Sequence, residues 1–196
     1  RNMLAHGTTT AEVKTGYGLD KDTELRMLEA LVHLDAILDI SIVPTFLGAH
    51  AIPPEFADQP DAYIEYICSQ VLPEVGEWWD RYAAGRPKPF VDVFCEKGAF
   101  DLKQSRRILE TAKTSGFPIK IHSDEFMSLG GTRLAVDLDA VSADHLVAST
   151  PEDILAVGKS DTVAVALPCT PFGLGDGSYT PAIDILSAGG YLAVAT

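Results

Sequence analysis

One stretch decides the fold: Ile119-Lys120-Ile121-His122-Ser123-Asp124-Glu125-Phe126. It begins with β-branched residues around one lysine and follows the turn-forming pair Ser115-Gly116, a pattern typical of a short interior strand in an α/β protein. The strand ends in a histidine, and a glutamate follows three residues later. Barrel folds form their active sites at the C-terminal ends of the strands. We therefore expect His122 and Glu125 to serve one site.

Strand and helix patterns alternate on both sides of this stretch. Predicted strands cover residues 8–15, 41–47, 90–95, 118–121, 140–143, 162–167 and 191–196. Predicted helices cover residues 22–38, 62–71, 73–82, 102–115 and 134–138, and two more begin near residues 150 and 180. This alternation predicts a parallel sheet with right-handed crossovers. The strands are short and apolar, as expected when both faces of a sheet are covered.

Local signals set several helix ends. We expect Asp22 to cap the helix that follows it, and Thr150 to cap a later helix with Asp153 as the acid of a capping box. Thr180 and the proline after it are expected to begin the last helix. Residues 168–177 are predicted to form a loop.

An open Rossmann-like sheet and a closed barrel both fit seven alternating strands. No G-x-G-x-x-G motif follows the first strand, which argues against a dinucleotide-binding sheet. Polar residues instead follow one strand after another: Tyr17, His50, Glu96, His122 with Glu125, and Asp144-His145. This distribution favours a (β/α)8 barrel that is one strand short, and we expect residues 1–196 to form a single domain.

Composition excludes several classes of protein. The chain has 196 residues, 46% of them hydrophobic, and a net charge of −13. It is too apolar for disorder and has no run of about 20 apolar residues that would cross a membrane. The acidic balance argues against a nucleic-acid partner. Three scattered cysteines without a C-x-x-C pair predict a cytoplasmic protein, and a homodimer is compatible with the acidic surface.

The polar residues at the strand ends predict metal-assisted hydrolysis. His122 is expected to bind a divalent metal, either zinc or iron, that activates water. Glu125 is expected to move the proton. His145 would stabilise the oxyanion or share the metal, and Tyr17 and His50 would orient a polar substrate.

Each of these residues also has a purely structural interpretation. Tyr17 could pack over the barrel rim, His50 could cap a loop and His145 could hold its neighbour Asp144. We expect Glu96 to form a salt-bridged strand end with the lysine after it. Asp124 is expected to be a structural carboxylate.

Five motifs in order along the chain resemble the imidazolonepropionase family of metal-dependent amidohydrolases. They are KTGYGL (14–19), FLGAHA (46–51), DVFCEKGAF (92–100), HSDEF (122–126) with LGG (129–131), and SADHL (142–146). The resemblance implies a distorted (β/α)8 barrel with one zinc or iron ion. It also implies ring opening of 4-imidazolone-5-propanoate to N-formimino-L-glutamate in histidine degradation.

The same resemblance implies a role for each candidate residue. His122 matches a metal ligand, and Glu125 matches the residue that activates water and protonates the ring nitrogen. His145 matches a histidine near the hydrolytic water. Tyr17 matches a substrate contact on the propionate side, and His50 matches one on the imidazolone ring.

The chain departs from the family pattern at both ends. The His-x-His metal pair and substrate-binding arginine of the first barrel strand are not in the sequence, nor is the metal-binding aspartate of the eighth. The small β-sandwich of the family is also missing. We therefore expect strands two to eight of the barrel, and a chain that by itself binds metal through one ligand and is inactive while the parent protein is active.

Two other readings remain open at this point. The chain could derive from a related amidohydrolase or deaminase that acts on another nitrogen heterocycle. It could also be a non-catalytic truncated barrel that serves as a scaffold.

Overall fold

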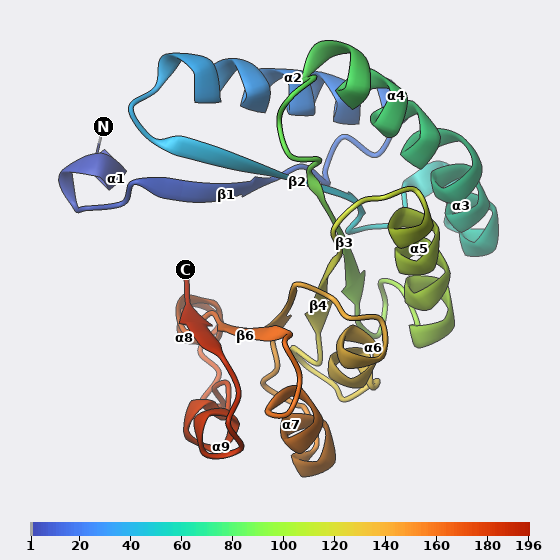
Figure 1. The fold of residues 1–196 in the computed structure, drawn as a ribbon. Helices are drawn as coiled ribbons and strands as arrows, with labels where there is room; N and C mark the ends of the chain where they lie inside the picture. Colours follow the sequence, from blue (N-terminus) through green and yellow to red (C-terminus); the bar gives the residue numbers. More distant parts are fainter. Residues whose placement is uncertain (1) are drawn as a thin grey trace.

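The computed structural model describes residues 2–196, and it shows a curved sheet of seven parallel strands with helices along its outer side (Figure 1). The strands are β1 (Thr10–Lys14), β2 (Ser41–Ala49), β3 (Phe90–Cys95), β4 (Lys120–Ser123), β5 (Ser142–His145), β6 (Val163–Ala166) and β7 (Leu192–Val194). Their order in the sheet is their order in the sequence. The seven strands and the parallel α/β arrangement confirm the prediction. The strand predicted over 140–143 lies two residues later.

A helix lies in every connection between strands. The α-helices are α1 (Asn2–Ala5), α2 (Lys21–Ile37), α3 (Pro60–Tyr66), α4 (Leu72–Tyr82), α5 (Leu102–Thr114), α6 (Gly131–Asp137), α7 (Pro151–Val157), α8 (Cys169–Leu174) and α9 (Ala182–Ser187). A 3-10 turn, η1 (Pro54–Phe56), and a π-helical turn, η2 (Ile67–Val71), complete the set. Among the described residues no helix is long and apolar enough to cross a membrane.

Two predicted helix caps need correction. The N-cap of α2 is Asp20, whose carboxylate accepts a hydrogen bond from the backbone N–H of Thr23 at 2.9 Å, while Asp22 lies inside the first turn. Thr150 caps α7 as predicted. The carboxylate of Asp153 accepts a hydrogen bond from the Thr150 hydroxyl at 2.7 Å. This contact differs from a capping box, in which the acid would bind the backbone N–H of the cap residue.

Two helical segments also differ from the prediction. The expected helices 62–71 and 73–82 form one run from α3 through η2 into α4. Pro73 has no N–H and cannot bond to the preceding turn, and the wide π turn directly before it allows the helix to continue. Residues 168–177 were expected to be a loop, but they contain the short helix α8.

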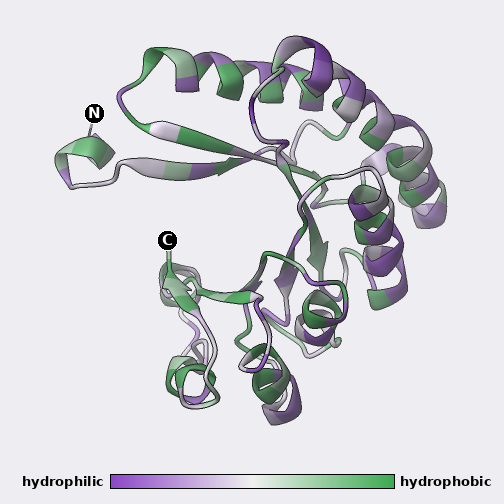
Figure 2. Ribbon diagram, viewed as in Figure 1, coloured by the Kyte–Doolittle hydropathy of each residue, from purple (hydrophilic) through white to green (hydrophobic). Residues whose placement is uncertain are grey.

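The apolar core lies between the outer side of the sheet and the helices. Its largest fully buried side chains include Phe46 on β2, Phe100 before α5 and Ile121 on β4. Helix α5 buries Ile108 and Leu109 against the sheet, each contributing about 1.5–3 kcal/mol. Hydrophilic residues lie mainly on the solvent side of the helices (Figure 2).

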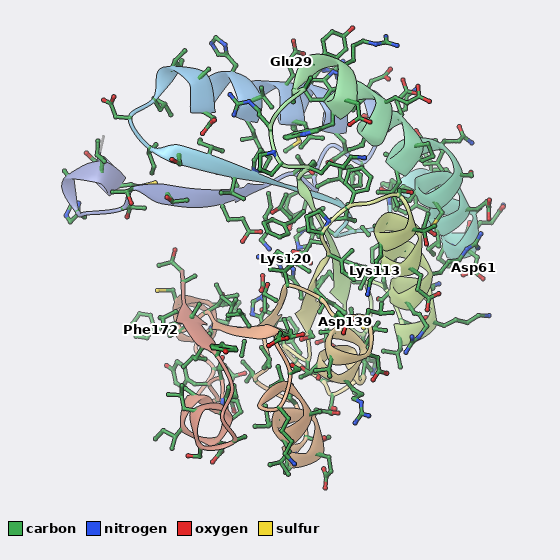
Figure 3. The ribbon with its side chains drawn as sticks, viewed as in Figure 1. Glu29, Asp61, Lys113, Lys120, Asp139 and Phe172 are labelled. Carbon is green, nitrogen blue, oxygen red and sulfur yellow. The ribbon has the colours of Figure 1, made fainter. Side chains whose placement is uncertain are left out.

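The inner side of the sheet is polar, so the expectation of strands that are apolar throughout is wrong for this side. Polar side chains occupy it, among them Glu12, Lys14, Thr45, Asp92, Lys120, Ser142 and Asp144. Lys120 Nζ on β4 lies 2.5 Å from Glu12 Oε2 on β1, although strands three apart in a flat sheet would lie about 14 Å apart. The sheet is therefore strongly curled, and Lys120 lies at the middle of the curve (Figure 3).

Candidate metal and acid–base site

The C-terminal ends of the strands bring together all five residues that the sequence singled out. Tyr17 follows β1, and its ring centroid lies 4.7 Å from that of His50 after β2. The His50 and His122 ring centroids are 6.0 Å apart, and those of His122 and His145 are 5.3 Å apart. Glu125 Oε1 lies 3.6 Å from His145 Nδ1. One continuous group of polar side chains results.

Three buried imidazole nitrogens in this group lack a hydrogen-bond partner. They are the Nδ1 atoms of His50, His122 and His145, considered against residues 2–196. A buried polar nitrogen without a partner is costly unless a ligand or water satisfies it. The cluster therefore has the unsatisfied donor atoms that a metal, water or substrate requires.

His122 lies against a buried carboxylate. Its Nδ1 is 3.0 Å from Asp92 Oδ2, although the alignment of the two groups does not meet hydrogen-bond geometry. Metal-binding histidines commonly direct one ring nitrogen at a carboxylate and the other at the metal. Burial of Asp92 alone would raise its pKa, but His122 and Lys14 more than offset this and hold the pKa well below its usual range.

The donor atoms of Asp92, His122 and Asp144 lie within 4.8 Å of one another. Nitrogen and carboxylate oxygen donors suit zinc and iron. The two carboxylates also contact Lys14, at 2.6 Å for Asp92 and 3.1 Å for Asp144. This ammonium group competes with a metal for the same oxygens. Of these three residues, only His122 has no contact with Lys14.

Charges on the inner side of the sheet do not cancel. Three carboxylates, of Glu12, Asp92 and Asp144, face two ammonium groups, of Lys14 and Lys120, which leaves one negative charge. Burial would lower the pKa of Lys14, but Asp92 and the other carboxylates raise it further than burial lowers it. The excess negative charge next to His122 fits a cation at this site, so the donor set and the charge both fit a divalent metal.

His145 has an unusual backbone. Its φ is 80° and that of Leu146 is 54°, both in the left-handed region that costs about 1–3 kcal/mol per non-glycine residue. The Thr180 hydroxyl donates a hydrogen bond to the His145 carbonyl at 2.6 Å. Thr180 was predicted to begin a helix; α9 instead begins at residue 182, and no side-chain capping bond is present there.

The protonation of His145 follows from its surroundings. Burial, with a smaller contribution from His122, lowers the pKa of His145 to about 4. Burial, again followed by His122, also lowers the pKa of His50. Both rings are therefore neutral near pH 7, as a hydrogen-bonding group beside a developing charge should be.

The loop after β4 carries Glu125. Asp124 anchors this loop, because its carboxylate accepts hydrogen bonds from the backbone of Leu129, Gly131 and Thr132. The expected structural role of Asp124 is thus confirmed. Burial raises the pKa of Glu125 and the nearby Glu96 adds to the rise, although His122 acts in the opposite direction. A carboxyl group with a raised pKa suits general acid–base work.

The expected ion pair at the end of β3 is wrong. The carboxylate of Glu96 accepts a hydrogen bond from the backbone N–H of Lys97 at 2.8 Å, and it also accepts from the backbone of Phe126 and Met127. The side chain is turned inward to the backbone because three N–H groups converge on it. The lysine side chain takes no part in these bonds.

Sequence reasoning missed the charged residues below the site. A two-residue alternation along the strands would have found them: Glu12 and Lys14 on β1, and Lys120 two residues before His122 on β4. Glu12, Lys14, His122 and Asp144 line a cavity of about 560 Å³ that also reaches His145.

Solved structures with the same fold include hydrolases and an adenine deaminase. An atrazine chlorohydrolase from Arthrobacter aurescens TC1, solved with zinc, matches 100% of this chain and 46% of its own, with a TM-score of 0.69 and 15% identity. The match to an adenine deaminase from Arthrobacter aurescens covers 98% of this chain and 58% of the deaminase, with a TM-score of 0.60 and 15% identity. The match to an amidohydrolase from Brucella melitensis covers 93% of this chain and 43% of the amidohydrolase, with a TM-score of 0.61 and 14% identity.

At such low identity these similarities establish the fold alone. Seven parallel strands in a curled half-barrel, with histidines and carboxylates at the strand ends, are the fold that this chain shares with these enzymes. Curated proteins of much higher sequence identity share one name. The imidazolonepropionase of Herpetosiphon aurantiacus is 53% identical over 194 residues, which is 99% of this chain and 45% of the relative.

Two further relatives carry the same name. The imidazolonepropionase of Chloroflexus aggregans is 48% identical, and the match covers 100% of this chain and 46% of the relative. That of Bacillus velezensis is 47% identical, and the match covers 99% of this chain and 44% of the relative. No protein-family model matches the chain. The resemblance predicted from the five motifs is confirmed: the chain is a homologue of imidazolonepropionases and spans about 45% of their length.

Proposed function

We propose that this chain carries the catalytic face of an imidazolonepropionase, which opens the ring of 4-imidazolone-5-propanoate to N-formimino-L-glutamate in histidine degradation. The observation that carries the proposal is that His122, Glu125 and His145 adjoin one another in a chain 53% identical to a curated imidazolonepropionase. Because the chain spans less than half of that relative, the activity proposed is that of the protein in its full natural length.

We further propose that β1 to β7 are strands two to eight of a (β/α)8 barrel, and that residues 1–196 belong to one domain. The curl of the sheet supports this assignment, since Lys120 on β4 contacts Glu12 on β1. Continuous burial of core residues from α2 to α9 supports a single domain.

His122 would bind the metal, and Asp92 would orient its ring. When bound, a divalent metal lowers the pKa of a water to about 7 and polarises a carbonyl group. The nitrogen and oxygen donors around His122 accept zinc and iron alike. We propose one divalent ion, zinc or iron, for the full-length protein.

Glu125 moves the proton in the proposed reaction. The water oxygen bonds to the ring carbonyl carbon and the ring C–N bond breaks. The proton that Glu125 takes from the water passes to the leaving nitrogen, so atoms and charges balance. The raised pKa of Glu125 suits it to accept and then donate this proton.

His145, His50 and Tyr17 position the reactants. The neutral ring of His145 lies beside Glu125 and would hydrogen-bond to the water or to the developing oxyanion. His50 would contact the imidazolone ring. Tyr17 is 73% exposed and lies over His50, where it would contact the propionate side.

The proposed partner is a small-molecule substrate. A net charge of −13 disfavours nucleic acid. The absence of a membrane partner, the cytoplasmic location and a homodimer stay predictions.

The direct test is turnover of 4-imidazolone-5-propanoate by the full-length protein, with Glu125→Gln alongside. Loss of general acid–base catalysis should lower kcat by about 10²–10⁴-fold. The deaminase reading is tested in the same assay with adenine and guanine, because one structural neighbour is an adenine deaminase. Turnover of a nucleobase without turnover of the imidazolone would replace the proposal.

A non-catalytic scaffold is the remaining alternative. Metal content per chain in the full-length protein distinguishes the proposed enzyme from a scaffold. About one zinc or iron per chain, absent in His122→Ala, supports the enzyme. A folded full-length protein that binds no metal supports the scaffold.

A further inference from the structure

Glu96 is a buried carboxylate without a cationic partner among residues 2–196. It directly follows β3 and is 3% exposed. Its Oε1 accepts from the Lys97 backbone at 2.8 Å, and its Oε2 accepts from the backbone of Phe126 at 2.9 Å and of Met127 at 3.3 Å. Backbone N–H groups therefore stabilise a charge that burial would otherwise make costly.

These bonds join two loops that lie far apart in the sequence. Glu96 lies at the start of the loop between β3 and α5, whereas Phe126 and Met127 lie 30 and 31 residues later in the loop between β4 and α6. Phe126 is the residue directly after Glu125. The carboxylate of Glu96 therefore fixes the backbone on the C-terminal side of the proposed acid–base residue.

Glu96 is itself held firmly. Its backbone N–H donates to the Phe100 carbonyl at 3.1 Å, and its carbonyl accepts from the Ala99 N–H at 3.0 Å. Together with β3 this tight turn makes a rigid support. Asp124 anchors the same loop further along, through Leu129 and the residues after it. Glu125 thus lies in a loop tied down at more than one point.

We propose that Glu96 is a positioning residue: its bonds to the backbone of Phe126 and Met127 hold Glu125 beside His145 in the site. This inference rests on the proposed function of Glu125. The proposal explains why a carboxylate is buried at this position with no partner except backbone. It gives Glu96 a role that acts through Glu125 and requires no contact with substrate.

The charge of Glu96 has a second effect on Glu125. The titratable groups around Glu125 are His122, His145 and Glu96, and Asp176 lines a small cavity with Glu125. Among them, Glu96 is the carboxylate whose charge raises the pKa of Glu125. Removal of this charge should make Glu125 easier to ionise, which moves the acid limb of the kcat/KM pH profile to lower pH.

The experiment compares Glu96→Gln and Glu96→Ala in the full-length protein. Glu96→Gln keeps one oxygen that can accept a hydrogen bond but loses the charge. We expect kcat to fall about tenfold with KM within about twofold, and the acid limb to move to lower pH. Glu96→Ala loses the anchor and should lower kcat about 100-fold, as expected for small displacements of a catalytic group. Glu110→Gln, on the exposed side of α5, is the matched control.

Hydrogen exchange gives a readout that does not depend on turnover. The backbone amides of Phe126 and Met127 should exchange faster than in wild type in both Glu96 variants. In Glu110→Gln their exchange rates should equal those of wild type. If wild-type protein does not open the imidazolone ring, the proposed function fails, while the exchange result still reports whether Glu96 anchors the loop.

Two outcomes would overturn the proposal. One is a folded Glu96→Gln protein with the kcat and acid limb of the control. The other is a loss of kcat without faster exchange at Phe126, which would mean that Glu96 acts by another route. If Glu96→Ala fails to fold by circular dichroism, the Glu96→Gln comparison decides alone.

Discussion

Lys14 Nζ lies 3.1 Å from Asp144 Oδ2, although the two residues are 130 positions apart and belong to β1 and β5. In a flat sheet, strands four positions apart would be separated by about 19 Å. The contact is therefore a direct sign that the sheet curls inward on its polar side. The same ammonium group also reaches Asp92 on β3 at 2.6 Å. One lysine joins three strands directly below the proposed catalytic group.

Replacing Lys14 by methionine should strongly destabilise the protein. Asp92 and Asp144 would lose their common cation while they remain buried, which costs about 3–5 kcal/mol when a buried pair is broken. Urea unfolding measures the loss. Lys113→Met is the control, because its partner Asp139 is exposed (Figure 3) and the pair contributes about 0–1 kcal/mol. Equal losses in the two variants would show that the Lys14 contacts are not structurally important.

Thr180→Val should impair catalysis more than it impairs stability. The variant keeps the shape of threonine but removes the hydrogen bond to the His145 carbonyl, so stability should fall by about 1 kcal/mol. Because His145 has a left-handed backbone that needs support, we expect kcat to fall about fivefold to tenfold as the ring loses its position. Steady-state kinetics measure this. Thr180→Ser should restore the rate, and a valine variant as fast as wild type would contradict the prediction.

The stability of metal-free protein should fall as the pH is lowered from about 6.5 to about 4. The pKa of His145 is lowered to about 4 in the folded chain, against about 6.5 in the unfolded chain. The unfolded state therefore binds the proton first. Above pH 6.5 the proton uptake of His145 does not affect the free energy of unfolding. Between pH 6.5 and pH 4 this uptake lowers the free energy of unfolding by up to about 3 kcal/mol.

Urea unfolding at pH 7 and pH 5, after treatment with a chelator, measures this effect. His145→Gln should show a smaller loss between the two values, because its side chain does not titrate. His33→Gln, on α2 and outside the site, should behave like wild type. An identical pH dependence in wild type and His145→Gln would refute the assignment.

Asp92→Asn should weaken metal binding by about 10–100-fold in the full-length protein, because the amide cannot orient the His122 ring as the carboxylate does. His122→Ala should abolish stoichiometric binding. Competition with a chelator measures the affinity. His33→Ala serves as the control, and full metal content in His122→Ala would exclude His122 as a ligand.

Much of the fold was predictable because strand and helix patterns are local. The turn signals around His122 and the alternating segments placed all seven strands within about two residues. Helix α8 was missed because Pro171 and Gly173 suggest a loop. The join between α3 and α4 was missed because Pro73 suggests a break. In the second case tertiary packing overrides the local signal, because α4 buries Leu72, Val75 and Trp79.

The candidate site was predictable only in part. Tyr17, His50, His122, Glu125 and His145 all follow or end strands, so a parallel sheet brings them to one edge. The roles of Lys14 and Thr180 depend on contacts across the curled sheet and from a distant loop. No local pattern encodes such contacts. Glu96 was misread because the lysine beside it suggested an ion pair, whereas the backbone of a later loop is its partner.

The sequential order of the strands has a consequence for how the chain folds during synthesis. Each strand pairs with the strand made just before it, so the sheet can grow one strand at a time as the polypeptide leaves the ribosome. The charges on the inner side do not follow this order. Asp92 is synthesised 78 residues after Lys14, and Asp144 is synthesised 130 residues after Lys14. Lys14 stays without these partners while α2 and β2 already pack, and the ion pairs on the inner side of the sheet are completed only after β5 has been made.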